Sequence, residues 1–356
     1  MKRDQPAILH VMDLDKFIAP FIDFVETHFA DFGRHRFFCF GDESRFPVRR
    51  RPNTRFRSDF SSLPRAYLAL AGEMNRADRI ILHGLFNIRV VRLLALQPWV
   101  LGKCYWAIWG GDLYGFRSAR RDKNWHRREL VRKFVIKRIG HLVTYTEGDV
   151  DLARQWYGAR GRHHRCLTYP SNLYRDYSVP PKTDTTVNIQ IGNSADPGNE
   201  HFEMLRRLER YKDENIRIYA PLSYGDPGHA KAVADEGARI FGEKFVPLTA
   251  FMPFEEYLGF LGKIDIAVFN HRRQQGMGNI TTLLGLGKKV YLRPDVTSRA
   301  MFEGIGITVC DSADIDLSPL DRALAERNHE LIKRYFSERV LVDQLRELFE
   351  DGVADA

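Results

Sequence analysis

The sequence predicts a two-domain α/β protein in which each domain has a parallel β-sheet covered by helices. Short apolar segments alternate with helical patterns along the 356 residues, a length sufficient for two ordinary domains. A proline-containing segment, residues 177–182, interrupts the alternation, and we expect it to link domains 1–178 and 179–356. Two such domains, with a binding loop in the second, are typical of a two-lobed enzyme that closes on its substrate.

The elements expected in the first domain follow a strand-then-helix rhythm. We expect strands at 7–12, 36–40, 79–83, 104–109 and 142–145, and helices at 17–29, 63–74, 88–96 and 118–139. The second domain repeats the rhythm. We expect strands at 187–191, 216–220, 239–241, 245–248, 264–269, 289–292 and 307–310, and helices near 199–211, 228–237, 254–261, 280–286, 317–335 and 338–350.

Composition sets the broad class. Hydrophobic residues make up 44% of the chain and aromatic residues 12%, which favours packed cores over disorder. The four cysteines form no C-x-x-C pair, which fits a reducing compartment and gives no zinc site. The N-terminus has no signal-peptide pattern, and the longest charge-free run, residues 274–287, is shorter than the roughly 20 residues that span a bilayer. We therefore expect a cytoplasmic protein without an integral anchor.

Charge is distributed unevenly between the two halves. Residues 1–180 contain 32 Lys/Arg and 18 Asp/Glu, whereas residues 181–356 contain 22 and 28. This asymmetry indicates that the first half faces a polyanion. A nucleic acid and an anionic membrane surface both satisfy that requirement.

A glycine-containing loop between two expected strands is the main candidate site of the second domain. It runs from Arg272 to Gly287 and leads into a short helix. The N–H groups and the dipole at a helix N-terminus favour an anion, and arginines add charge suited to a diphosphate. The loop matches neither the dinucleotide fingerprint nor the P-loop, so an ordinary strand-to-helix turn is the alternative. Its candidate ligand-binding residues are Arg273, Gln274, Gln275, Gly276, Gly278 and Asn279.

Polar residues also follow other expected strands, where ligands of parallel sheets bind. Each of them could equally be a capping or turn residue. The group comprises His83, Asn87, Trp109 and Tyr114 in the first domain, and Gly192, Asn193, Ser194, Asn199 and Tyr224 in the second.

Two carboxylates are candidates for catalysis. Asp112 follows an aromatic strand and two glycines, so it could lie at the edge of a cleft with a raised pKa and act as a general base. Glu200 has a similar position in the second domain. The alternative is that Asp112 caps the helix after it and that Glu200 is a first-turn residue favoured by the helix dipole.

Three D-x-D matches, at 13–15, 149–151 and 314–316, could in principle hold a metal. Matches of this kind arise by chance among 46 acidic residues, so we expect no metal site.

The expected helix after Asp112 is strongly basic. Residues 117–138 contain ten Lys/Arg and two Asp/Glu. We expect the arginines to face outward toward anionic lipid, with Arg120, Arg121, Arg127 and Arg128 as the membrane contacts. An ordinary solvated face is the alternative. We expect an apolar stripe that packs on the domain, formed by Leu130, Val131, Phe134, Val135 and Ile139.

Together, the strand-end motifs resemble a known family. H-G-x-F-N at 83–87, W-x-I-W-G-x-D-L-Y at 106–114, G-N-S-x-D-x-x-N-E-H at 192–201, Y-L at 257–258 and R-Q-Q-G-x-G at 273–278 occur in order. The chain resembles the TDP-N-acetylfucosamine:lipid II N-acetylfucosaminyltransferases of enterobacterial common antigen synthesis, glycosyltransferase family 56. The likeness spans about residues 8 to 292. The chain departs from the family pattern in its unusually Arg-rich segments 41–62 and 115–128 and in Asn279, where another small polar residue is usual.

The resemblance implies a metal-independent GT-B hexosyltransferase without a cofactor, with two Rossmann-like domains facing across a cleft. It implies transfer of 4-acetamido-4,6-dideoxygalactose (Fuc4NAc) from a dTDP-sugar to an undecaprenyl-diphosphate-linked disaccharide, on the inner face of the cytoplasmic membrane. The donor would bind the second domain. The acceptor would bind the first, with His83, Asn87, Trp109 and Tyr114 as its contacts. Another nucleotide-sugar, a soluble acceptor, and a non-enzymatic protein that binds nucleic acid or lipid through its basic surface are the alternatives.

Overall fold

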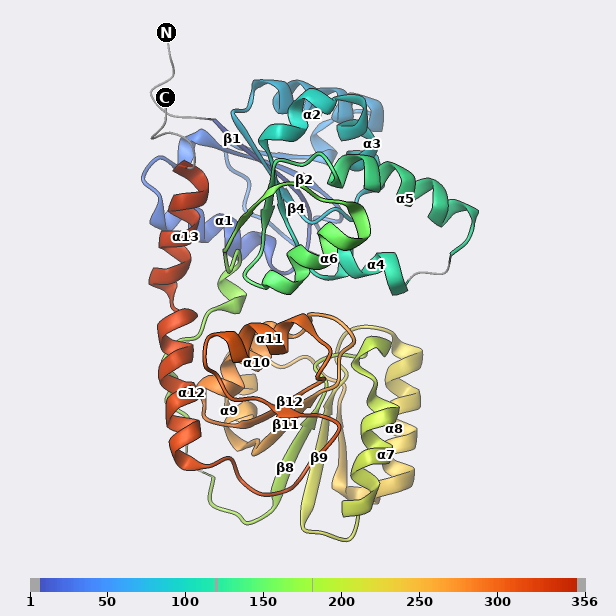
Figure 1. Cartoon of the computed structure of the whole chain (residues 1–356), viewed down its shortest axis with the longest axis vertical. Helices are drawn as coiled ribbons and strands as arrows, with labels where there is room; N and C mark the ends of the chain where they lie inside the picture. The colour runs from blue at the N-terminus through green and yellow to red at the C-terminus, as the bar shows by residue number, and fades with distance from the viewer. Residues whose placement is uncertain (1–6, 119–120, 181, 351–356) are drawn as a thin grey trace. The chain divides into compact units, whose positions relative to one another are not determined.

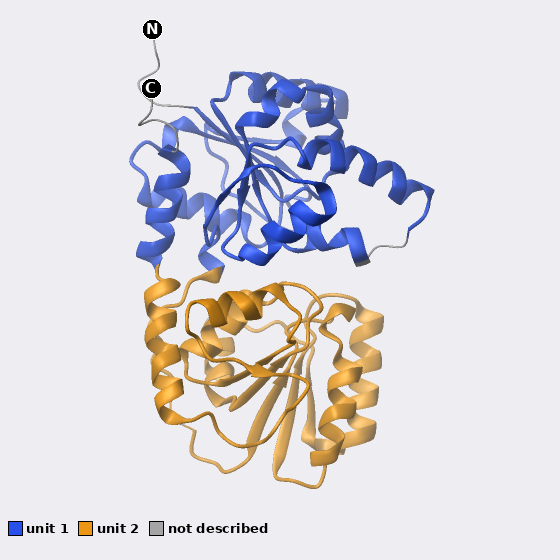
Figure 2. Cartoon of the chain, in the orientation of Figure 1, with its two compact units in different colours: residues 1–171, 338–356 blue, residues 172–337 orange. Residues whose placement is uncertain are grey.

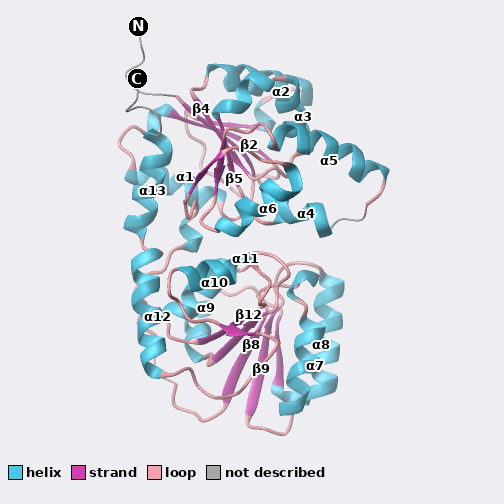
Figure 3. Ribbon diagram, in the orientation of Figure 1, coloured by secondary structure: helices cyan, strands magenta, loops and turns pink. Residues whose placement is uncertain are grey.

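The computed structural model describes residues 7–118, 121–180 and 182–350. The chain divides into two compact units, residues 1–171 with 338–356 (unit 1) and residues 172–337 (unit 2) (Figure 2). Each unit has a parallel sheet flanked by helices (Figure 3), as the sequence predicts. Among the described residues, no helix is both long and apolar enough to cross a bilayer.

Unit 1 contains a seven-stranded parallel sheet in the order β3-β2-β1-β4-β5-β6-β7. Figure 1 labels its strands β1, β2 and β4. The strands are β1 Ile8–Asp13, β2 His35–Phe40, β3 Thr54–Phe56, β4 Arg79–His83, β5 Cys104–Ala107, β6 His141–Val143 and β7 Arg162–His164. The helices are α1 Ile18–His28, α2 Leu63–Arg76, α3 Ile88–Leu96, α4 Gly111–Ser118, α5 Lys123–Ile136, α6 Glu147–Tyr157 and α13 Glu338–Glu350. The strand order reverses between β1 and β4, so the loops after these two strands diverge there and leave room for a ligand.

Unit 2 contains a six-stranded parallel sheet in the order β10-β9-β8-β11-β12-β13. The strands are β8 Val187–Ile191, β9 Ile216–Pro221, β10 Phe245–Leu248, β11 Ile266–Phe269, β12 Lys289–Leu292 and β13 Cys310–Asp311. The helices are α7 His201–Leu208, α8 Pro227–Phe241, α9 Phe254–Lys263, α10 Met277–Gly285, α11 Thr297–Gly304 and α12 Arg322–Tyr335. The reversal in strand order lies between β8 and β11.

The sequence analysis does not predict α4, α6, β7 or α11, and three of its expectations differ from the structure. The strand expected at 239–241 is the last turn of α8, because Val233, Gly237 and Phe241 continue one buried helical face. The basic helix expected at 118–139 is shorter, because α4 ends at Ser118 and α5 begins only at Lys123, where Asp122 accepts a hydrogen bond from the Trp125 N–H as its N-cap. The last helix, α13, belongs to unit 1, where the Phe349 ring lies 4.6 Å from that of His35.

The apolar stripe expected on the basic helix is only partly present. Val135 and Ile139 are buried as expected, but Leu130 is 74% exposed. Ile136 is buried instead, because helix α5 packs with a different rotation about its axis. Arg132, expected among the outward arginines, is buried and donates to the carbonyls of Leu85 and Asp112.

Candidate functional site

The loop after β8 begins with a position that only glycine can occupy. Gly192 has φ 66°, and a Cβ there would lie 2.6 Å from Asn199 Oδ1 and 2.7 Å from His201 Nε2. Backbone strain and these contacts both exclude a side chain. The backbone after β8 therefore lies directly against the start of α7, at the point where the strand order of unit 2 reverses.

Asn199 joins three of the predicted residues into one network. It is 1% exposed, and its Oδ1 accepts from the Asn193 N–H at 2.9 Å while its Nδ2 donates to Ser194 Oγ at 3.2 Å. The same Oδ1 lies 2.8 Å from Nε2 of His271, whose Nδ1 lies 3.2 Å from the Gln275 carbonyl, and a neutral ring donates to one of these two acceptors. Burial lowers the pKa of His271 to about 3 and keeps the ring neutral. Asn193, Ser194 and Asn199, three of the predicted donor-binding residues, are thus neighbours in the structure.

The glycine loop meets this network at Gly276. This residue has φ 69° and precedes the first turn of α10, and a Cβ on it would lie 3.1 Å from Asn193 Cγ. Gln275 Nε2 is 3.5 Å from Asn193 Oδ1. Gly278 and Asn279 are in the first turn of α10, where N–H groups have no intrahelical acceptor. The loop and the end of β8 thus form one surface beside a helix N-terminus.

Both arginines of the loop are held by carboxylates from the β8–α7 segment. Arg273 Nη2 lies 3.1 Å from Asp196 Oδ2, and Arg272 Nε lies 2.8 Å from Glu200 Oε1. The sequence presents Glu200 as a candidate catalytic carboxylate. In the structure its carboxylate is ion-paired with Arg272, and its φ is 56°. The Arg273 side chain is 26% exposed and that of Arg272 is 67% exposed, so Arg273 is the more firmly placed cation.

Two further predicted residues lie near this surface. The hydroxyl of Tyr224 accepts from Asn193 Nδ2 at 3.0 Å, and the residue is 44% exposed. Gln274 is half-buried within the same loop. Reasoning from strand ends missed His271, which follows β11 by two residues. His201, the last residue of the motif at 192–201, is fully buried, and its Nδ1 lies 3.2 Å from Nε2 of His229. Burial lowers the pKa of His201 to about 3.

In unit 1, Asp112 lies at the carboxyl end of the sheet and is 4% exposed. Its Oδ2 accepts from Trp106 Nε1 at 2.7 Å and the Leu85 N–H at 2.9 Å, and its Oδ1 accepts from the N–H groups of Trp109 and Leu113 at 3.0 Å each. Burial raises its pKa, while the Trp106 bond and the Arg132 charge oppose that shift. Four donors occupy the carboxylate, so its geometry suits holding the loops after β4 and β5 together.

A second carboxylate, Asp13, lies at the end of β1, where the loops after β1 and β4 diverge, and sequence reasoning set it aside within a D-x-D match. Asp13 ends β1, is half-buried, and accepts from Asn87 Nδ2 at 3.0 Å. A recess of about 10 Å³, room for about one water molecule, is lined by Asp13, Gly84 and Asn87 together with apolar residues. Burial raises the pKa of Asp13, opposed by the Asn87 bond. The position at the reversal of strand order is the signal that could have found it.

The predicted acceptor residues of unit 1 separate into three places. His83 Nδ1 and Trp109 Nε1 both contact the Tyr169 hydroxyl, at 2.7 Å and 2.6 Å. Asn87 caps α3 through its Oδ1 and faces Asp13 through its Nδ2. Tyr114 lies apart from them, because its hydroxyl donates to Asp149 at 3.1 Å and the residue is buried.

His83 continues into a chain of buried imidazoles. His10 Nδ1 lies 3.0 Å from His83 Nε2, and His10 Nε2 lies 3.0 Å from His35 Nδ1. Burial lowers the pKa of His35 and of His83 to about 3, and it lowers that of His10 well below 6.5. Each neutral ring carries one proton, so the tautomer of one imidazole sets that of the next. No feature of the local sequence indicates this chain.

Three of the four arginines predicted as membrane contacts can be placed on the surface of unit 1. Arg121, Arg127 and Arg128 are exposed, whereas Arg120 lies outside the described residues. The exposed Leu130 lines a recess with Phe116, Trp125 and Phe134, so the surface of α5 combines charge with apolar area.

Among the residues that the structure describes, no group of three or more His, Cys, Asp and Glu side chains could hold a metal ion.

Comparison with known proteins decides the family. The model of the family described as "4-alpha-L-fucosyltransferase glycosyl transferase group 56" matches residues 23–303. The chain belongs to glycosyl transferase group 56. This membership and the likeness to solved glycosyltransferases identify a hexosyltransferase with the GT-B fold.

The solved structures similar to this group 56 chain include three proteins of low sequence identity. Anabaena Alr3699/HepE, in complex with UDP and glucose, has a TM-score of 0.70 and 12% identity, over 97% of this chain and 100% of that one. Sucrose-phosphate synthase from Thermosynechococcus elongatus has a TM-score of 0.65 and 11% identity, over 99% and 100%. WaaG, a glycosyltransferase involved in lipopolysaccharide biosynthesis, has a TM-score of 0.61 and 10% identity, over 96% and 98%.

Proposed function

We propose that this group 56 enzyme transfers Fuc4NAc from dTDP-Fuc4NAc to an undecaprenyl-diphosphate-linked disaccharide (lipid II) in the synthesis of enterobacterial common antigen or a related polysaccharide. The observation that carries the proposal is the surface at the β8–β11 reversal in unit 2. There Gly192 and Gly276 leave the backbone without side chains beside the N-terminus of α10. Bare backbone and a helix N-terminus are what a nucleoside diphosphate requires.

Residues of unit 2 would bind and activate the donor. The first-turn N–H groups of α10, with Gly278 and Asn279, face the diphosphate, and Arg273 contributes a positive charge. As the bond between the sugar and the diphosphate breaks, negative charge grows on the leaving dTDP, and these groups stabilise it. The exposed ring of Tyr224 is placed to contact the base or the sugar, because its hydroxyl is fixed by Asn193. No metal ion or cofactor is required for this stabilisation.

Residues of unit 1 would bind the acceptor and take its proton. Asp13 is the candidate base, since it is half-buried, has its pKa raised by burial, and lines a recess at the β1–β4 reversal. A raised pKa makes a carboxylate a stronger proton acceptor near neutral pH. Asp112 holds the surrounding loops, while Trp109 and His83 are fixed through Tyr169. In this proposal Asp112 is a positioning residue.

The surface of α5 would bring the enzyme to the anionic inner face of the cytoplasmic membrane. Arg121, Arg127 and Arg128 supply charge, and each basic residue near such a surface contributes about 1 kcal/mol. Leu130 and the recess beside it add apolar contact. A lipid-linked acceptor remains in the membrane, so a membrane-bound enzyme would meet it there.

A transfer assay tests the proposed substrates. Purified enzyme is incubated with the undecaprenyl-diphosphate disaccharide and with either dTDP-Fuc4NAc or a UDP-hexose. The molecular mass of the lipid product is then measured by mass spectrometry. The proposal predicts a trisaccharide lipid from dTDP-Fuc4NAc alone. Product from the UDP-sugar alone would overturn the donor assignment, and transfer only to a soluble saccharide would overturn the acceptor assignment.

A further inference from the structure

Unit 1 contains a recess that the proposed function does not use. It has a volume of about 770 Å³ and is lined by residues that include Arg36, Arg49, Arg51 and Arg55. The segments that form it, residues 32–38 and 49–55 with the end of α2, precede or begin β2, β3 and β4. In a parallel sheet these are the amino ends of the strands. The recess therefore lies at the edge opposite to Asp13 and His83.

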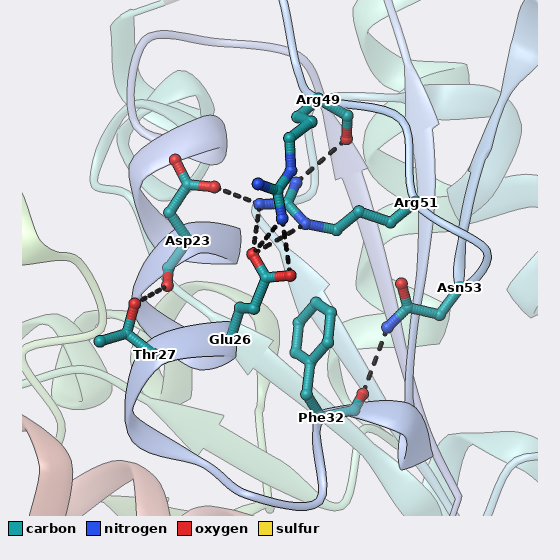
Figure 4. Close-up of polar contacts among 7 residues, drawn as sticks. All are labelled: Asp23, Glu26, Thr27, Phe32, Arg49, Arg51 and Asn53. Carbon is teal, nitrogen blue, oxygen red and sulfur yellow. Dashed lines mark hydrogen bonds and ion pairs between the residues drawn. The ribbon is translucent and has the colours of Figure 1, made fainter.

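The arginines on one side of the recess share a single glutamate. Arg51, with a side chain only 4% exposed, bonds to Asp23, to Glu26 at 2.8 Å and to the Arg49 carbonyl at 3.0 Å (Figure 4). Arg49 Nη2 donates to both oxygens of Glu26, at 2.7 and 2.8 Å, yet its side chain is 68% exposed. Arg51 is thus the buried anchor, and Arg49 is a fixed guanidinium with N–H groups left for a ligand.

The other side repeats the arrangement around Glu73. This side chain is 8% exposed and lies 2.6 Å from Arg36 Nη1, 3.6 Å from Arg76 Nη1 and 3.9 Å from Arg55 Nη1. The Arg36 and Arg55 side chains are 46% and 55% exposed. One carboxylate cannot occupy the five N–H groups of each of three guanidinium groups. Glu26 and the buried Glu73 therefore hold arginines that line the recess and have further N–H donors.

The remaining walls of the recess limit the kind of ligand. Phe32, Phe37 and Leu9 supply apolar area, and Arg50 is already paired with Glu43 at 2.8 Å and Asp59 at 2.5 Å. The free donors are therefore those of Arg36, Arg49 and Arg55. Planar guanidinium groups bind phosphate oxygens in pairs. We propose that this recess binds a phosphate- or diphosphate-bearing molecule, either soluble or a lipid headgroup, independently of the donor site.

Calorimetric titration of the full chain with pyrophosphate tests the soluble source. Saturating dTDP is present throughout, and the titration is repeated in Arg273→Gln, so binding at the α10 N-terminus is recognised whether or not the donor proposal holds. Arg49→Gln with Arg55→Gln should weaken pyrophosphate binding at least tenfold. Arg65→Gln with Arg92→Gln, which removes the same charge from exposed arginines elsewhere in unit 1, should leave it unchanged.

A second variant tests the recess without removing charge. A Cβ at Gly33, a lining residue without a positive φ, would meet no atom within 4 Å, so Gly33→Trp should fold and obstruct the recess. Loss of pyrophosphate binding at an unchanged melting temperature supports the proposal. If pyrophosphate does not bind, loss of sedimentation with phosphatidylglycerol vesicles in both recess variants supports the lipid headgroup as the source. If these variants change neither pyrophosphate binding nor sedimentation with the vesicles, the proposal is overturned.

Discussion

The indole Nε1 of Trp109 donates a 2.6 Å hydrogen bond to the hydroxyl of Tyr169, although the two residues are 60 positions apart in the chain. Tyr169 is also 2.7 Å from His83 Nδ1, the first imidazole of the buried chain. A surface side chain of the carboxyl edge is thereby connected to the core of unit 1. The orientation of Trp109, a proposed acceptor contact, depends on a hydroxyl that local sequence patterns do not single out.

Replacing Tyr169 with Phe should loosen Trp109. The change leaves Trp109 Nε1 and the buried His83 Nδ1 without their partner, and we expect it to lower the free energy of unfolding by about 1–3 kcal/mol. The KM for the lipid-linked acceptor should rise more than the KM for dTDP-Fuc4NAc. Steady-state kinetics with each substrate varied measure both, and Tyr335→Phe on α12 is the matched control. Equal changes in the two KM values would contradict the acceptor role of Trp109.

The imidazole chain predicts that unit 1 loses stability in acid. The folded pKa values of His35 and His83 are lowered to about 3 from 6.5 by burial, so the unfolded chain binds protons that the fold excludes. The contribution of these two neutral imidazoles to the free energy of unfolding is fully present above pH 6.5. It decreases as the pH drops toward 3, by about 1.4 kcal/mol per pH unit for each imidazole. Denaturant unfolding at pH 5 to 7 measures this slope. His35→Phe should reduce it, whereas the exposed His126→Gln should not; an unchanged slope in His35→Phe would refute the explanation.

Asp13 and Asp112 should respond differently to the same substitution. Asp13→Asn should reduce kcat by roughly a hundredfold or more, the usual scale for a general base, while dTDP affinity and melting temperature stay near wild type. Asp112→Asn should lower the melting temperature, because its amide nitrogen would face N–H donors in place of a carboxylate oxygen. In wild type the acid limb of the kcat/KM profile should lie above 3.8, since burial raises the pKa of Asp13. Full activity in Asp13→Asn would remove it as the base.

The α5 surface predicts salt-sensitive vesicle binding with an apolar component. Arg127→Gln with Arg128→Gln should weaken sedimentation with phosphatidylglycerol vesicles at low salt, because charge interactions are screened over about 10 Å at 0.1 M salt. Leu130→Ser should weaken the binding that persists at high salt. The control is Arg65→Gln with Arg92→Gln. If the α5 variants sediment like wild type, this helix is a solvated face, and residues 45–57 become the candidate contact.

Local sequence patterns predict most strands and helices, because period and capping residues act over a few positions. They predict Asn193, Ser194, Asn199 and the glycine loop as one region, since these residues follow neighbouring strands. They do not predict Arg132, whose burial depends on carbonyls 47 and 20 positions away, or the imidazole chain, whose links span 25 and 73 positions. A histidine inside an apolar strand resembles a core residue until the fold places others beside it. Asp13 can be recognised as a candidate base only when the strand order of unit 1 is known.

The central claim is that unit 2 binds a nucleoside diphosphate through the loop before α10. Calorimetric titration of dTDP into wild type, Arg273→Gln and the exposed-arginine control Arg206→Gln tests it most directly. The account predicts one site in wild type, unchanged affinity in Arg206→Gln, and at least tenfold weaker binding in Arg273→Gln, consistent with loss of a charge-assisted contact worth about 1.5–3 kcal/mol. Wild-type affinity in Arg273→Gln would contradict it.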